Sequence, residues 1–75
     1  MMMLSTVKPG TIATVAALAT NNDAIVKKLL AMGIYPGVEI ELERRFPSYV
    51  IKIGRSRAAF DQQIAHYIYL RPCDC

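Results

Sequence analysis

The strongest constraint on the fold of this chain lies within residues 29–42, where a helix must end and a strand begin within a few residues. Gly33 follows an amphipathic segment at the position where a helix end needs a left-handed residue, which glycine adopts without a Cβ clash. Pro36 and Gly37 fit the central positions of a type II turn, because proline fixes φ at the first and glycine takes a positive φ at the second. Alternation then begins, with Val38, Ile40 and Leu42 on one face and Glu39, Glu41 and Glu43 on the other. This spacing joins one helix and one strand into a single unit.

The length and composition indicate one small globular domain. The chain has 75 residues, so its core must be thin, and charged residues make up 20% of it. The apolar runs are too short to cross a bilayer, and residues 1–4 lack the basic and apolar regions of a signal peptide. We therefore expect a cytoplasmic protein. Cys73 and Cys75 lie one residue apart at the C-terminus, where a disulfide would constrain almost nothing.

Alternating apolar residues between turn signals predict five short strands, over residues 11–18, 38–46, 49–53, 57–60 and 67–70. In the first strand, Ile12 and Ala16 alternate with Thr11 and Ala13. Pro47 predicts a hairpin tip longer than two residues, and Gly54 predicts a break or bulge. Arg71-Pro72 is expected to end the last strand.

Two helical segments complete the expected structure. A helix is predicted over residues 24–32, after an Asn or Asp N-cap, with a buried stripe formed by Ile25, Leu29 and Met32. A single turn of 3-10 type, capped by Asp61, is predicted over residues 61–65. These elements describe a small closed all-β barrel with one helix after the first strand.

Four sequence elements then point to a known family. They are Val7-Lys8-Pro9-Gly10 before the first strand, Leu29-Leu30-Ala31-Met32-Gly33-Ile34-Tyr35-Pro36-Gly37 after the helix, Arg57-Ala58-Ala59-Phe60, and Ile64-Ala65 before the last strand. With these elements the chain resembles the FeoA family, small cytosolic components of bacterial ferrous iron transport. A similar domain occurs at the C-terminus of iron- and manganese-responsive repressors. Because no DNA-binding domain precedes the resemblance here, we expect the stand-alone component.

The resemblance implies an SH3-like barrel of about five strands over residues 1–72, followed by a tail at residues 73–75. It also implies an accessory protein that binds and modulates FeoB, a membrane permease with a cytosolic GTPase domain, and that meets the membrane only through that permease. The chain departs from the family pattern at two places. Its hairpin tip at residues 46–49 is shorter than usual, and Cys73-Asp74-Cys75 is not a family feature.

The residue types and their spacing give little indication of a catalytic, cofactor-binding or metal-binding site. His66 is the only histidine, and no acid lies at a spacing that suggests a triad partner. The four glycines are scattered rather than gathered in a phosphate-binding loop, so the chain itself is not expected to bind GTP. Cys73, Cys75 and His66 fall short of the four ligands that a structural zinc site needs. We expect no enzyme, no cofactor and no metal site.

Docking is the function that the remaining residues favour. Basic residues gather without acids in the segment 44–57, and a second group combines positive charge with apolar side chains around the helix end. The first group is Arg44, Arg45, Lys52, Arg55 and Arg57; the second is Lys27, Lys28, Leu30, Ile34 and Tyr35. Solubilising charge and ordinary packing are the plain alternatives for both groups.

Two further partners stay open. The basic segment, together with Tyr67 and Tyr69, could bind nucleic acid, which is the alternative function and the less favoured one. Small barrels with exposed strands also self-associate, so a weak homo-oligomer stays open as well.

Overall fold

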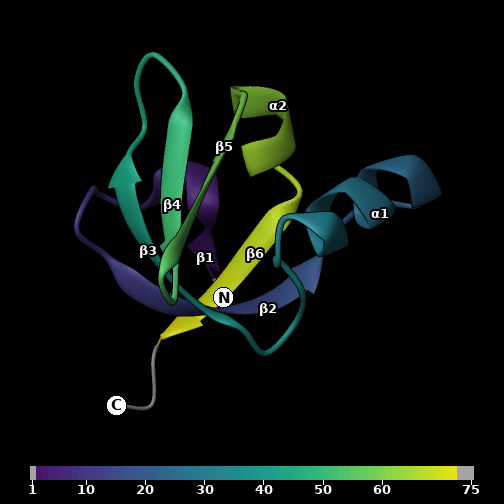
Figure 1. The fold of residues 1–75 in the computed structure, drawn as a ribbon, viewed down its shortest axis with the longest axis horizontal. Coiled ribbons are helices and arrows are strands. Elements are labelled where there is room, and N and C mark those ends of the chain that lie inside the picture. Colours follow the sequence, from purple (N-terminus) through teal and green to yellow (C-terminus); the bar gives the residue numbers. More distant parts are fainter. Residues whose placement is uncertain (1, 73–75) are drawn as a thin grey trace.

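The computed structural model describes residues 2–72 as one bent antiparallel sheet with three short helical segments (Figure 1). Six strands lie in the order β1-β6-β2-β3-β4-β5. Their bounds are β1 Met2–Met3, β2 Ile12–Leu18, β3 Glu39–Arg44, β4 Tyr49–Ile53, β5 Ser56–Phe60 and β6 Ile68–Pro72. The helical segments are η1 Leu4–Thr6, α1 Asp23–Ala31 and α2 Gln62–Ala65. This is the small all-β, SH3-like architecture with a helix that the sequence predicts.

The barrel is open, which corrects the prediction of a closed one. β1 and β5 are the two edges of the sheet, and no ladder joins them within residues 2–72. β1 is also a sixth strand that the sequence does not predict, and it pairs Met2 with Leu70 and Met3 with Tyr69. Figure 1 shows α2 following β5 at one end of the barrel, while α1 stands outside the sheet.

The joint between α1 and β3 forms as predicted. Gly33 has φ +87°, and its N–H donates to Leu30 O at 3.0 Å. Ile34 N–H donates to Leu29 O at 2.9 Å, which completes a Schellman motif. The side chains of Leu29 and Ile34 form the apolar contact of this motif, and both are buried. Gly37 has φ +101°, and the hydrogen bond from Val38 N to Tyr35 O at 3.1 Å closes the type II turn.

Both longer helical segments begin at side-chain caps. Asn22 accepts a hydrogen bond from Ala24 N at 2.9 Å, so α1 begins at Asp23, one residue before the prediction. Asp61 caps α2 as predicted by accepting from Ile64 N at 3.0 Å. α2 is an α-helical turn, so its predicted 3-10 type is wrong.

Tertiary pairing changes two of the strands. In β2 the buried face holds Ala13 and Val15, whereas Ile12 is 51% exposed. β6 runs through Arg71 to Pro72, beyond its predicted end, because it stays paired with β2 there. Within residues 2–72, β1 pairs with β6 no further than Leu70, so a proline that donates no hydrogen bond is tolerated past that point.

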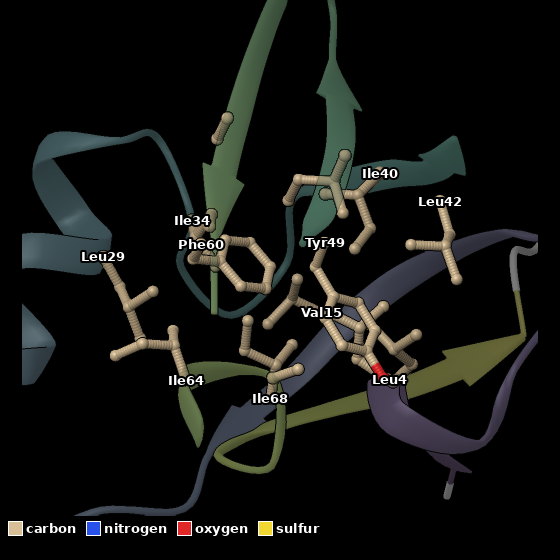
Figure 2. Close-up of a cluster of buried hydrophobic side chains, with 14 of the residues drawn as sticks. Leu4, Val15, Leu29, Ile34, Ile40, Leu42, Tyr49, Phe60, Ile64 and Ile68 are labelled. Atoms are coloured by element: carbon tan, nitrogen blue, oxygen red, sulfur yellow. The ribbon is translucent and has the colours of Figure 1, made fainter. Parts of the chain in front are cut away.

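The hydrophobic core lies inside the bent sheet, and side chains from almost every element contribute to it. Figure 2 shows Leu4 from η1, Leu29 from α1 and Ile64 from α2 pointing toward the strand residues Val15, Ile40 and Ile68. The apolar faces of the strands supply Ile40, Leu42, Ile51, Ile68 and Leu70, which are all buried, while Val38 and Ile53 pack against the core half-buried. Leu29 is the buried member of the α1 stripe, and Ile25 and Met32 pack against the core while half-buried.

Candidate functional site

The outer face of β3, β4 and β5 carries four exposed bases, which we call the sheet surface: Arg44, Lys52, Arg55 and Arg57. Lys52 lies opposite Arg57 in the β4–β5 ladder. Arg55 follows Gly54 in the two-residue turn that links these strands, where Gly54 has φ +59°. Gly54 therefore serves a tight hairpin turn rather than a bulge.

Acids from β3 lie beside these bases, although the segment 44–57 itself contains none. Glu41 is the ladder partner of Lys52. Arg57 Nε donates to Glu43 Oε1 at 2.6 Å across the outer face, and Arg57 Nη2 donates to Glu43 Oε2 at 3.4 Å. Arg57 therefore holds the pKa of the Glu43 carboxyl below its ordinary value, mainly through this hydrogen bond, and Glu43 in turn raises the pKa of Arg57. The sheet surface is thus less positive than the sequence segment suggests.

Arg45, the fifth base of this group, points elsewhere. Its guanidinium donates from Nη2 to Ser5 O at 2.8 Å and from Nη1 to Val7 O at 3.1 Å. These hydrogen bonds tie the end of β3 to η1 at the N-terminus, and they are partly buried. Arg45 therefore has a structural role, and the sheet surface is formed by the other four bases.

The second candidate, which we call the helix surface, consists of Lys27, Lys28, Leu30 and Tyr35. All four are exposed, with Leu30 at 50% and Tyr35 at 47%. Ile34, which the sequence groups with them, is fully buried, because it fills the apolar position of the Schellman motif. Figure 1 places α1 on the opposite side of the barrel from the β3–β4 hairpin.

Sequence reasoning misses one exposed aromatic residue. Phe46 lies in the loop 45–48 between β3 and β4 and is 77% exposed. Tyr49, at the other end of this loop, is buried and stacks on Phe60 with ring centroids 6.0 Å apart. The alternation of β3 breaks down at Arg44, where the ladder register shifts, so the pattern gives no sign of which side chain leaves the barrel.

Two shallow depressions lie on the outer face of the sheet. One is lined by Ile12, Glu41 and Lys52, and the other by Glu43, Arg44 and Arg57. No group of three His, Cys, Asp or Glu side chains within residues 2–72 could hold a metal ion. Cys73 and Cys75 lie outside the described residues, and no helix in the described part is long and apolar enough to cross a membrane.

A family model for the FeoA domain matches residues 2–72, which is nearly the whole chain. The chain belongs to the FeoA domain family. Membership associates it with ferrous iron transport, and FeoA domains are small accessory domains without catalytic activity. No curated protein sequence matches the chain.

Solved structures with FeoA domains share the fold. A crystal structure described as an iron uptake regulatory protein (FeoA) is 26% identical, with a TM-score of 0.84, and the match covers 93% of each chain. The solution structure of iron(II) transport protein A from Clostridium thermocellum is 31% identical, with a TM-score of 0.83. That match covers 95% of this chain and 45% of the other chain. The predicted SH3-like FeoA fold is thereby confirmed.

The domain also resembles part of a longer protein. The crystal structure of T. acidophilum IdeR matches with a TM-score of 0.90 at 18% identity. The match covers 96% of this chain and 34% of that protein, so at this identity it shows a shared fold only.

Proposed function

We propose that this FeoA domain is a cytoplasmic accessory protein that binds a FeoB-type ferrous iron permease at its cytosolic GTPase domain and modulates it. The observation that carries this proposal is the family match over residues 2–72, together with a FeoA structure of nearly equal length. A protein of this kind shifts the conformational equilibrium of its partner only if it binds one conformation of the partner more tightly than another.

The two exposed surfaces support docking as the mode of action. The sheet surface offers positive charge beside Glu41 and Glu43, and the helix surface offers Leu30 and Tyr35 beside two lysines. Exposed apolar groups rimmed by charge are typical of docking sites, where a few side chains carry most of the affinity.

Charge reversal on each surface tests the proposal and identifies the surface in use. We expect Lys52→Glu to weaken binding to the purified GTPase domain if the sheet surface docks, and Lys28→Glu to weaken it if the helix surface docks. Arg71→Glu is the matched control, because Arg71 is an exposed base on β6, outside both surfaces. Calorimetry at physiological salt measures all four proteins, and a wild-type chain that fails to bind would contradict the proposal.

The same proteins also separate this function from nucleic-acid binding. Arg45 donates to backbone carbonyls and Arg57 pairs with Glu43, so the basic segment has fewer free cations for phosphates than its sequence suggests. A generic single-stranded oligonucleotide should therefore not bind. Binding that weakens steeply as salt rises would favour the nucleic-acid alternative instead.

A further inference from the structure

The loop between β3 and β4 presents a large apolar side chain to solvent. Phe46 is 77% exposed, against 51% for Ile12, 50% for Leu30 and 47% for Tyr35, the other exposed large apolar residues in the described part of the chain. Figure 1 shows this loop rising beyond the end of β3 and away from the barrel. Phe46 therefore adds little to the core. Because its ring is still exposed, burying the ring against another molecule would be favourable.

The residues at both ends of the loop are fixed, so the position of Phe46 is held from two sides. On one side, Arg45 turns back and donates to the carbonyls of Ser5 and Val7. On the other, Tyr49 is 3% exposed and stacks almost parallel to Phe60. A side chain presented on a loop with anchored ends loses less conformational entropy on binding than one on a free loop.

The charge around the loop defines the surface that Phe46 fits. Arg44 is exposed directly before the loop, and the acid that lies beside it, Glu43, is already paired with Arg57. An acidic contact would therefore complement the base of the loop, while an apolar contact would take the ring.

We propose that Phe46 is an anchor residue that inserts into an apolar pocket with an acidic rim on the protein partner of this chain. This inference rests on the proposed function, since the partner probed is the permease. Arg44 contacts the acidic rim, and Arg45 is a positioning residue that holds the loop. Insertion of the same ring into a lipid membrane, instead of a protein pocket, is the alternative that the test must exclude.

The experiment compares wild type with three variants on the full permease reconstituted in nanodiscs that contain anionic lipid. Phe46→Ser should bind about 10- to 100-fold more weakly than wild type, the loss expected when a phenylalanine anchor no longer enters its pocket. His66→Ser is the matched control, because His66 also carries an exposed ring but lies at the end of α2, outside both candidate surfaces, and it should bind like wild type. Arg44→Glu should also bind more weakly, and more so at low salt.

Each outcome decides the inference. If wild type and Phe46→Ser bind the permease equally well, the proposed function stands and the anchor is refuted. If wild type binds empty nanodiscs of the same lipid as tightly as loaded ones, and Phe46→Ser loses both, the occupant is lipid and the pocket is refuted. If wild type binds neither, the proposed function fails and the anchor fails with it.

Discussion

Replacement of Arg45 by alanine tests how the N-terminal segment is held against the barrel. The guanidinium joins two carbonyls, of Ser5 and Val7, that lie about 40 positions away in the sequence. The segment that they belong to begins with η1, whose first residue, Leu4, is 0% exposed and part of the core. Removal of the side chain therefore leaves two partly buried acceptors unpaired and loosens a segment that seals the core.

The size of the effect follows from these contacts. A hydrogen bond to a charged group contributes about 1.5–3 kcal/mol, and water can replace part of it at partly buried carbonyls, so we expect a total loss of about 2–4 kcal/mol. A domain of this length has an unfolding free energy of about 4–11 kcal/mol. Since 1 kcal/mol corresponds to about 4–8 °C in a domain of this size, Tm should fall by at least about 8 °C.

Thermal and urea unfolding of Arg45→Ala and Arg44→Ala measure this difference directly. Arg44 is the neighbouring residue and the matched control, because its exposed side chain makes no hydrogen bond within residues 2–72. Its replacement should change the unfolding free energy by less than about 0.5 kcal/mol. Amide exchange at residues 4–7 should accelerate only in Arg45→Ala. A Tm drop below about 2 °C for Arg45→Ala would refute the structural role given to this residue.

Three further predictions follow from local geometry. Gly33→Val should lower the unfolding free energy by about 2 kcal/mol, because φ is +87° there, and unchanged thermal stability would contradict the assigned helix end. Asn22→Ala should cost about 0.5–2 kcal/mol by removing the cap on Ala24 N, whereas Asn22→Asp should restore stability in urea unfolding. Arg57→Gln should raise the pKa of Glu43 toward its ordinary value in an NMR titration. Because the folded pKa of Glu43 is lowered, its contribution to stability is present above the unfolded pKa and disappears as pH falls through the folded one, and a titration unchanged by Arg57→Gln would refute the pairing.

The parts of the fold that follow from local chemistry could be predicted from the sequence. Gly33 and the Pro36-Gly37 pair have backbone requirements that few other residues satisfy, so the joint forms where the sequence places it. Asp61 likewise marks the start of α2. Strand β4 has its predicted bounds, because clear alternation is enclosed between two turns.

The parts that depend on contacts between distant residues could not be predicted. Met2 and Met3 form a strand only because β6 is there to pair with them. In β2, the small Ala13 takes the inward position and the larger Ile12 faces out, since the ladder partners set the phase of the strand. For the same reason Arg45 leaves the proposed docking group, because its partners are backbone carbonyls that no side-chain pattern reveals.

The sequence predicts which residues belong to the candidate surfaces, but it does not predict which of them lie together in the folded chain. Lys52 and Arg57 lie side by side on neighbouring strands of one sheet, but the next strand of that sheet places Glu41 and Glu43 beside them. Ile34, which the sequence groups with the exposed residues of the helix end, lies in the core. Phe46 was missed because an apolar residue beside a turn gives no sign of whether it faces in or out.

The central claim, that this FeoA domain modulates its permease through the GTPase domain, is tested most directly by affinity in two nucleotide states. Calorimetry at physiological salt would measure binding of the chain to the purified GTPase domain with GDP and with a non-hydrolysable GTP analogue. The account predicts at least about a tenfold difference between the two affinities, because equal binding cannot shift an equilibrium. Equal affinity in both states, or no binding in either, would contradict it.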